Sequence, residues 1–296
     1  MIERIVKAAK KNGLVTTFRN KFPRLFLYTV VKPLTWIRYK DAKQALKGDI
    51  RHLPNRPSIL LFTSEKCAST YTKTIFTKLA SDVGMFSADV EAYFSVKEID
   101  PNVYFNDPRH RSTVFQPTGR YLGPLRNFYP IENLEQYKKV LVLRDPRDVL
   151  TSFYYSVLHS HIVINDAFYE KRQHYADYDI DTFVIEYLPY VKAIYQGYID
   201  NLLPVENLLI LPYELLVTDF QSWLDQLVAF IGLDDVNPEV IDNIIATENA
   251  VRPDGKKTSH IRSKQPGDYK DKLKSETQEY LTEELTSILR KLEYPL

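Results

Sequence analysis

The chain has 296 residues, which is enough for one large domain or two small ones around a sizeable buried core. Hydrophobic residues make up 44% of it and charged residues 26%, so the composition excludes a chain that is disordered throughout. The formal net charge of +1 excludes a general nucleic-acid binder, which would carry a large excess of cations, but allows a local basic site for one small anion.

Cys67 is the only cysteine, so no internal disulfide can form, and no group of residues shows metal-site spacing. The best apolar candidate for a membrane span, Leu25–Ile37, is shorter than the roughly 18 residues that a span requires. It is also interrupted by Lys32 and Pro33, and the N-terminus lacks the long apolar core of a signal peptide. We therefore expect a cytoplasmic protein that uses no metal.

Residues 1–50 form a basic, aromatic leader, and residues 51–296 are expected to form a single domain. Over most of the leader, many Lys and Arg residues face only Glu3 and Asp41. We expect a helical leader that packs on the core and exposes a solvated basic face. The alternative is peripheral contact with an anionic membrane or an acidic partner, because interleaved cations and aromatic side chains are typical of membrane-surface helices.

The first predicted strand–turn–helix unit begins at Ser58. Ser58–Thr63 (SILLFT) is a short apolar run bounded by turn signals, which is typical of a buried strand. From Thr70 the apolar residues recur at helical spacing. The predicted apolar face of this helix consists of Tyr71, Ile75, Phe76, Leu79 and Val83.

The same pattern recurs along the chain. Lys139–Leu143 and Leu208–Leu211 are further apolar runs, each followed by helical spacing, the second near Glu214–Ile231. A long amphipathic segment, Ile180–Leu203, lies between them. Strands that alternate with helices predict an α/β fold with a central parallel sheet flanked by helices on both faces. Ligands of such sheets bind beyond the carboxyl ends of the strands.

Two later helices are predicted from their first residues. Asn237 followed by Pro238 is typical of an N-cap and a first helical position. Ser275 with Gln278 three positions later predicts a capping box at the start of the last helix.

The first strand is followed by a short polar segment, Ser64–Tyr71 (SEKCASTY). A helix N-terminus offers free backbone N–H groups and a positive dipole end, to which Lys66, Ser69 and Thr70 would add a cation and two hydroxyls. We predict a P-loop-like phosphate cradle here; the alternative is that a hydroxyl merely caps the helix. Both glycines of GxxxxGK[ST] are missing, which argues against an ATP-dependent kinase.

Two further segments carry cations. Arg144–Ser152 (RDPRDVLTS) follows the second strand, where Arg144 is well placed to meet a phosphate bidentately. The alternative is that Arg144 forms an ion pair with Asp148 and that Ser152 is ordinary surface. Arg262–Lys270 (RSKQPGDYK) is a polar, basic segment, which in isolation would be interpreted as a solvated loop.

Together, the three segments resemble the motifs of the cytosolic-type sulfotransferase family, which uses 3′-phosphoadenosine 5′-phosphosulfate (PAPS) and releases adenosine 3′,5′-bisphosphate (PAP). EKCASTY stands where that family has PKSGTTW, with Cys67 and Ala68 as departures. RDPRDVLTS matches R-[ND]-P-[KR]-D-V-x-x-S at every fixed position. RSKQPGDYK matches the first arginine, the second glycine and the last lysine of RKGxxGxWK, but departs at Ser263 and Lys264. Tyr213 and the glutamate after it match the family's aromatic–acidic pair.

The resemblance implies a PAPS-dependent sulfotransferase with a role for each matching position. The 5′-phosphosulfate would be held by the first segment: Lys66, Cys67, Ala68, Ser69 and Thr70. Adenine would contact Tyr71 and Tyr213. The 3′-phosphate would be held by residues of the other two segments: Arg144, Ser152, Arg262, Ser263 and Lys264. Lys66 would also stabilise the charge that develops on the leaving oxygen.

The general base is less evident, because the family's usual histidine has no counterpart in Ser112–Arg126. Glu91 begins an E-A-Y-F segment similar to the E-x-[HY]-F setting of the glutamate base in carbohydrate-type sulfotransferases. We expect Glu91 to be the base, with His110 as the second choice. The alternatives are an exposed surface carboxylate and a plain loop histidine. Arg120 and Arg126 are expected to anchor their loop through ion pairs; the alternative is that both line a site for an acidic or polar acceptor.

The acceptor would be a hydroxyl or an amine of a small-molecule, carbohydrate or lipid substrate. We expect variable loops at Phe86–Tyr129 and His159–Tyr178 to bind it. Two other functions stay open: a non-catalytic nucleotide-binding or scaffold protein, favoured by the absent histidine, and a phosphotransferase on the same architecture. The sequence leaves the oligomeric state open.

Overall fold

The computed structural model describes residues 25, 28–29, 39–50, 53–160, 165–233, 235–251 and 266–296. Within them, the strands are β1 (Ile59–Thr63), β2 (Phe86–Ala88), β3 (Arg120–Leu125), β4 (Lys138–Leu143) and β5 (Leu208–Pro212). The helices are α5 (Lys40–Lys47), α6 (Ser69–Asp82), α7 (Val90–Lys97), α8 (Pro101–Tyr104), α9 (Pro108–Val114), α10 (Pro146–Tyr155), α11 (Asp166–His174), α12 (Ile180–Asn201), α13 (Tyr213–Thr218), α14 (Phe220–Ile231), α15 (Pro238–Val251), α16 (Tyr269–Lys272) and α17 (Ser275–Lys291).

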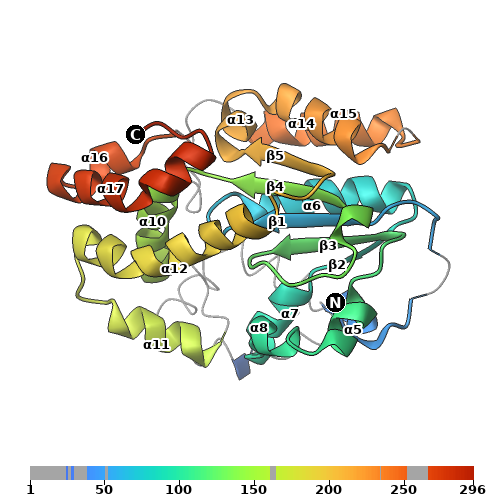
Figure 1. Cartoon of the computed structure of the whole chain (residues 1–296), viewed down its shortest axis with the longest axis horizontal. Coiled ribbons are helices and arrows are strands. Elements are labelled where there is room, and N and C mark those ends of the chain that lie inside the picture. The colour runs from blue at the N-terminus through green and yellow to red at the C-terminus, as the bar shows by residue number, and fades with distance from the viewer. Residues whose placement is uncertain are drawn as a thin grey trace.

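The strands form one sheet in the order β2-β3-β1-β4-β5, and every neighbouring pair is parallel. Helices cover both faces of this sheet (Figure 1). The predicted α/β fold is therefore confirmed. Because all five strands run the same way, their carboxyl ends lie at one edge, where loops from different parts of the chain can meet.

The sheet separates two hydrophobic clusters. Leu60 and Phe62 of β1 belong to one cluster and Leu61 to the other, because successive side chains of a strand point to opposite faces. The first cluster is shared with α7, α10, α12 and α17, and the second with α6, α14 and α15. In Figure 1, α13, α14 and α15 lie above the sheet, whereas α7 and α12 lie below it. Burial on both faces explains why β1 and β4 are continuous apolar runs, whereas β5, at the edge of the sheet, is only partly buried.

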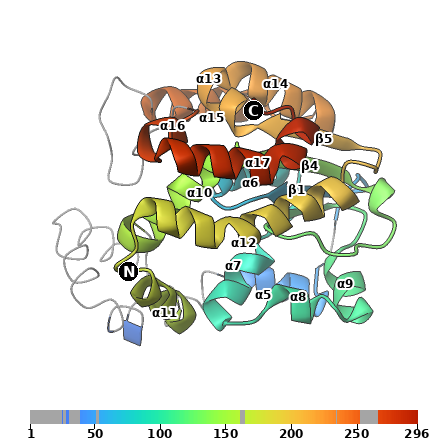
Figure 2. The same cartoon turned by 60° about the vertical axis from the view of Figure 1, so that its left-hand side comes forward.

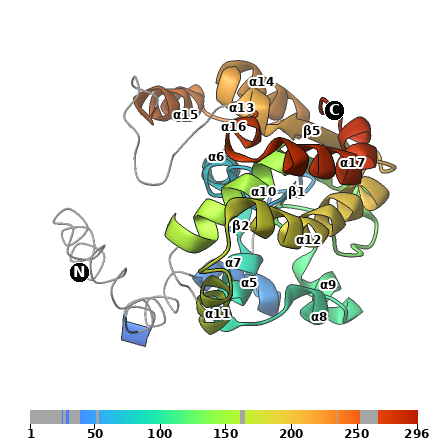
Figure 3. The ribbon, with the colours of Figure 1, turned by 90° about the vertical axis from the view of Figure 1, so that its left-hand side faces the viewer.

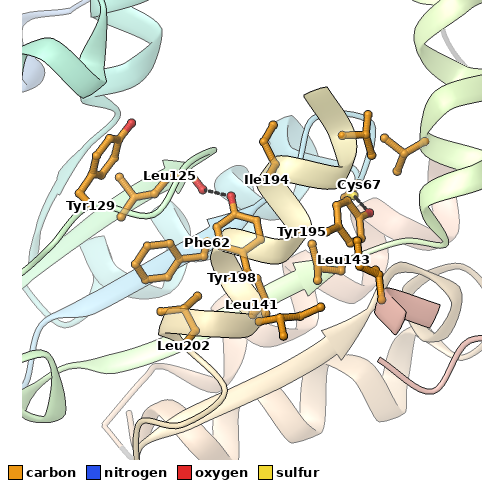
Figure 4. Close-up of a cluster of buried hydrophobic side chains, with 14 of the residues drawn as sticks. Phe62, Cys67, Leu125, Tyr129, Leu141, Leu143, Ile194, Tyr195, Tyr198 and Leu202 are labelled. Atoms are coloured by element: carbon orange, nitrogen blue, oxygen red, sulfur yellow. Dashed lines mark hydrogen bonds between the residues drawn. The ribbon is translucent and has the colours of Figure 1, made fainter. Parts of the chain in front are cut away.

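Helix α12 fixes the carboxyl ends of three strands. The hydroxyl of Tyr198 donates to the carbonyl oxygens of Thr63 and Leu125, both at 3.1 Å. Figure 4 shows the bond to Leu125. The hydroxyl of Tyr195 donates to the carbonyl oxygen of Arg144 at 2.5 Å. α17 packs along α12, and both contact α10 (Figures 2 and 3). The loops that leave β1, β3 and β4 therefore start from a braced edge.

Several predicted elements differ from the structure. The expected helix near Glu214–Ile231 is two helices, because Asp219 ends α13 and caps α14 by accepting the N–H of Ser222. The predicted capping box of α17 is wrong: the N-cap is Lys274, and the Gln278 amide donates instead to the carbonyls of two preceding residues. The start of α15 is confirmed, since Asn237 Oδ1 accepts the N–H of the second helical residue.

The stretches expected to be loops, residues 86–129 and 159–178, instead contain α7, α8, α9, α11 and two strands. Of the leader, residues 25, 28–29 and 39–50 are described, and the rest lies outside the described residues. α5 packs against α7, α9 and β2. Tyr28 donates to the carboxylate of Asp166 at 2.7 Å. Over the part of the chain that is described, no helix is long and apolar enough to cross a membrane.

Gly119, just before β3, permits a tight approach to the chain that precedes β1. Its φ is +74°, and a Cβ there would lie 2.6 Å from the Leu53 Cβ atom and 2.9 Å from the Pro54 carbonyl oxygen. Gly84 has nearly the same φ of +73° with no atom within 4 Å. We expect Gly84→Ala to lower the free energy of unfolding by about 1–2 kcal/mol, through backbone strain alone. Gly119→Ala should cost a further 1–3 kcal/mol or so, because the methyl group also clashes.

Urea unfolding of the two variants beside the parent chain measures this difference. Equal losses in both would show that the chain around residue 119 moves aside freely.

Candidate active site

Lys66 and Arg144 lie at the same edge of the sheet, each just beyond the carboxyl end of its strand. β1 and β4 are neighbours, with Thr63 opposite Val142. The Nζ atom of Lys66 donates to Ser156 Oγ at 2.9 Å, and Ser156 directly continues the helix that follows Arg144. The predicted meeting of the first two basic segments is therefore confirmed.

The connection between β1 and α6, Ser64–Ala68, is called the phosphate loop below. Lys66 and Ala68 both have left-handed backbones, with φ of 67° and 60°. Ala68 is the N-cap of α6, so the N–H groups of the first helical turn, at Ser69 and Thr70, face out of the loop. Together with the positive end of the helix dipole, these groups favour an anion at this point.

The side chains of the phosphate loop divide between the core and the site. Cys67 is fully buried, and its Sγ atom lies 3.9 Å from the Tyr195 hydroxyl (Figure 4). Burial raises the pKa of Cys67 to about 12, so the thiol stays neutral. Only the backbone N–H of Cys67 can therefore bind an anion. Burial lowers the pKa of Lys66, while Glu65 opposes that change and the charge of Arg144 adds to it. An incoming anion would therefore relieve the repulsion between two neighbouring cations.

Arg144 is held rigidly although it is a buried cation. Its guanidinium lies over the ring of Tyr213, with Cζ 4.6 Å from the centroid, and Nη2 donates to Asp148 Oδ2 at 3.2 Å. The alternative of an ion pair with Asp148 is thus correct, but this pair engages Nη2 and not Nε. Within the described residues, Arg144 Nε is buried and has no hydrogen-bond partner. Ser152 lies half-buried on α10, two turns into the helix. An acceptor group such as a phosphate oxygen would satisfy Nε.

Only the end of the third basic segment is described. Three of its predicted 3′-phosphate ligands lie outside the described residues: Arg262, Ser263 and Lys264. The backbone N–H groups of Gly267 and Tyr269 donate to the carboxylate of Asp148 at 2.8 and 2.9 Å. The guanidinium of Arg147 also lies over the ring of Tyr269, with Cζ 4.5 Å from the ring centroid. The end of the third segment is therefore attached directly to the second.

The two tyrosines predicted to contact adenine belong to the second hydrophobic cluster. Tyr71 lies on α6 with its ring centroid 6.2 Å from that of Phe220, and Tyr213 begins α13. The carboxylate of Glu214 accepts the N–H of Asp145 at 3.0 Å, which joins α13 to the segment that carries Arg144. Both rings thus lie on elements that contact the sheet edge described above.

Glu91 lies on the first turn of α7 and is only 6% exposed, so the alternative of an exposed surface carboxylate is wrong. Its Oε1 atom accepts the Tyr129 hydroxyl at 2.6 Å and the Arg126 backbone N–H at 2.8 Å. Its Oε2 atom lies 3.5 Å from Arg126 Nη1, which confirms the predicted ion pair of Arg126. Burial raises the pKa of Glu91 to about 7, although the charge of Arg126 and the bond from Tyr129 oppose this.

Glu91 is linked electrostatically to the phosphate loop. The charge of Glu65, the residue next to Lys66, helps to raise the pKa of Arg126, the ion-pair partner of Glu91. The charges of Glu65 and Glu91 also raise the pKa of Tyr190 on α12, whereas the charge of Arg126 lowers it. Glu65 and Arg126 lie just beyond the carboxyl ends of β1 and β3, and Glu91 accepts the Arg126 N–H, so the carboxylate lies at the sheet edge that carries the phosphate loop.

His110 lies on α9, which precedes β3 and is therefore at the other end of that strand from Arg126. Its ring stacks on Tyr104, with centroids 4.0 Å apart, and its Nδ1 lies 2.9 Å from the Tyr104 carbonyl oxygen. Arg120, at the start of β3, donates to the carbonyl oxygens of the last residues of α9. Among the described residues Arg120 pairs with no carboxylate, so its predicted ion pair is wrong. The structure therefore does not bring His110 to the edge that carries the phosphate loop.

Sequence reasoning missed three residues that shape the site: Ser156, Tyr129 and Tyr195. Ser156 lies four positions after Ser152, so helical spacing alone would have placed both on one face. Tyr129 and Tyr195 reach their partners only through the fold, and no local pattern indicates them. In the described ranges, no group of three or more His, Cys, Asp or Glu side chains could hold a metal ion.

Comparisons with known proteins find a family model and similar solved structures. A family model described as the sulfotransferase domain matches residues 56–292. A mouse sulfotransferase complexed with PAP matches the structure with a TM-score of 0.53 at 15% identity, covering 86% of this chain and 94% of that chain. A retinol dehydratase in a complex with retinol and PAP gives a TM-score of 0.47 at 16% identity, with 87% and 86% covered. No curated protein matches the chain significantly.

Proposed function

The chain belongs to the sulfotransferase family, and we propose that it is a PAPS-dependent enzyme whose acceptor is a hydroxyl or an amine of a small-molecule, carbohydrate or lipid substrate. The proposal for the site is supported above all by one observation. Lys66 and Arg144 extend from adjacent parallel strands to the same edge, so one bisphosphorylated nucleotide can contact both.

We infer the following contacts with the donor. The 5′-phosphosulfate would be held by the side chains of Lys66, Ser69 and Thr70 and by the backbone N–H groups of Cys67 and Ala68. Adenine would lie against Tyr71 and Tyr213. The 3′-phosphate would be held by Arg144 and Ser152, joined by residues outside the described part of the chain: Arg262, Ser263 and Lys264. The unsatisfied Nε of Arg144 and the anion-favouring start of α6 fit such a ligand.

In the reaction, an oxygen or nitrogen of the acceptor attacks sulfur. The new bond forms in line as the bond from sulfur to the phosphate oxygen breaks. Lys66 is placed to stabilise the negative charge that develops on that leaving oxygen. A base takes the proton that the acceptor loses. The catalysis that remains is positioning, which the braced edge of the sheet supplies.

Glu91 is the base in this proposal. A carboxylate is useful as a base near neutral pH when its pKa lies close to that pH, and burial raises the pKa of Glu91 to about 7. Tyr129 and the Arg126 backbone hold Oε1 in place, and the shared electrostatic neighbours connect it with the phosphate loop. The location of His110 beyond the opposite end of β3 supports Glu91 over the histidine.

We also propose how the leader packs, what its basic residues contact and where the protein is located. The leader is proposed to pack on the domain of residues 51–296, supported by the packing of α5 and by the bond from Tyr28 to Asp166. Its basic residues are proposed to allow peripheral contact with an anionic membrane. A cytoplasmic location is supported by the single buried thiol, Cys67.

Nucleotide binding and sulfate transfer together test the proposed function. Calorimetry should show PAP binding far more tightly than ADP, because Arg144 is positioned for a 3′-phosphate that ADP lacks. Transfer of labelled sulfate from PAPS to a panel of hydroxyl and amine acceptors should then reveal turnover. Tighter binding of ADP would favour a phosphotransferase. PAP binding without transfer to any acceptor in the panel would favour a nucleotide-binding scaffold.

A further inference from the structure

Three charged residues of the segment Arg144–Ser152 are outside the proposed contacts with the nucleotide: Asp145, Arg147 and Asp148. Of these, Asp148 is the residue that accepts a hydrogen bond from Arg144. Its side chain is fully buried on the first turn of α10. Oδ1 accepts the Tyr269 N–H at 2.9 Å, and Oδ2 accepts both the Gly267 N–H at 2.8 Å and Arg144 Nη2 at 3.2 Å. One carboxylate therefore joins the strand end of β4 to the end of the third basic segment.

We propose that Asp148 is a positioning residue that sets the Arg144 guanidinium and the entry to α16 in one arrangement, and thereby gives the site its selectivity for a 3′-phosphate. This inference rests on the proposed function, because it takes Arg144 as a ligand of that phosphate. Asp148 itself does not contact the nucleotide.

The geometry shows why Asp148 orients Arg144 without occupying it. The contact with Asp148 uses Nη2, Nε has no hydrogen-bond partner among the described residues, and the Tyr213 ring covers one face of the guanidinium. Two of the three donors to Asp148 are backbone N–H groups, and the carboxylate also lies at the positive end of α10. The negative charge is therefore stabilised mainly by the backbone, so Arg144 keeps its capacity for a second anion.

Asp145 and Arg147 strengthen the same connection between α10 and the start of α16. Arg147 is 1% exposed and donates to the carboxylate of Asp145, to Thr282 of α17 and to the Pro295 carbonyl oxygen. It also lies over the ring of Tyr269. The ring of Tyr269 is thus held by Arg147 while its N–H is held by Asp148, so the start of α16 is fixed from two sides.

Asp148→Asn is the sharpest test, because an amide has only one acceptor oxygen. In either amide orientation, an NH2 group faces the Tyr269 N–H or the donors from Gly267 and Arg144. Calorimetry should show PAP affinity falling about 10- to 100-fold, while affinity for adenosine 5′-monophosphate stays within about twofold. Hydrogen exchange at the Gly267 and Tyr269 amides should also accelerate, and that readout does not depend on any nucleotide.

Arg144→Ala and the double variant complete a mutant cycle. If Asp148 acts through Arg144, the double variant should lose little more PAP affinity than Arg144→Ala alone. Asp148→Glu keeps the charge but displaces it by one methylene, and it serves as the test variant if Asp148→Asn does not fold; its ratio of PAP to monophosphate affinity should fall as well.

An unchanged ratio of the two affinities in a folded variant would overturn the proposal, as would equal losses for both nucleotides or unchanged exchange at the two amides. A parent chain that does not prefer PAP over the monophosphate would instead count against the proposed function. In that case the exchange measurement still decides whether Asp148 holds the start of α16.

Discussion

Replacing Lys66 by methionine should lower kcat by about 10²–10³-fold, with a much smaller loss of PAP affinity. Methionine keeps the length of the side chain but removes the charge that would meet the leaving oxygen. Burial and the neighbouring Arg144 already lower the pKa of Lys66, so its ammonium is poorly solvated before the donor binds. Such a preorganised charge contributes most when charge develops in the transition state.

Steady-state kinetics with PAPS, together with calorimetry with PAP, measures both effects. Lys78→Met is the matched control, because Lys78 lies on the same helix α6 but further from the phosphate loop. It should leave kcat unchanged. A Lys66→Met enzyme that keeps more than about a tenth of the parent kcat would contradict the assigned role.

The sequence predicted the strands whose residues form a continuous apolar run. Ser58–Thr63 and Lys139–Leu143 were recognisable because central parallel strands are buried and apolar on both faces. Leu208–Leu211 was recognisable from its apolar run alone, since β5 lies at the edge of the sheet and is only partly buried. β3 escaped prediction from the apolar pattern, since its segment RYLGPL has a glycine and a proline in the middle, and both disfavour strands. β2 is only three residues long and partly exposed, too short to show any period. Tertiary pairing with neighbouring strands decides both cases.

Candidate-site residues were predictable where each directly follows a strand that the sequence predicts. Lys66 and Arg144 each follow a predicted strand, and the carboxyl ends of parallel strands share one edge, so their meeting could be expected. The partners of Glu91 could not: Tyr129 lies 38 positions away in a segment expected to be a loop. The same holds for Asp148, where the local arginine was foreseen but the amides of Gly267 and Tyr269, about 120 positions later, were not.

Glu91→Gln is expected to lower kcat by about 10²–10⁴-fold while PAP affinity changes by less than about twofold. Glutamine keeps the size of the side chain and one acceptor oxygen, so the hydrogen bond from Tyr129 or from the Arg126 backbone can persist. It cannot take a proton from the acceptor. Sulfate transfer and PAP calorimetry on the same preparation separate the two effects. A fully active Glu91→Gln enzyme would exclude this base without affecting the family.

The pH profile gives Glu91 a distinctive signature. Only the carboxylate form is a base, and burial raises its pKa to about 7. In the parent enzyme, kcat/KM should therefore fall about tenfold per pH unit below that value and level off above it, whereas the residual activity of Glu91→Gln should lack this limb.

The Tyr129 hydroxyl favours the charged carboxylate, so its removal must raise the pKa of Glu91. Tyr129→Phe should thus shift the acidic limb to higher pH and keep most of the plateau. A limb that stays in place in Tyr129→Phe would mean that a group other than Glu91 titrates, because the two oxygens lie only 2.6 Å apart.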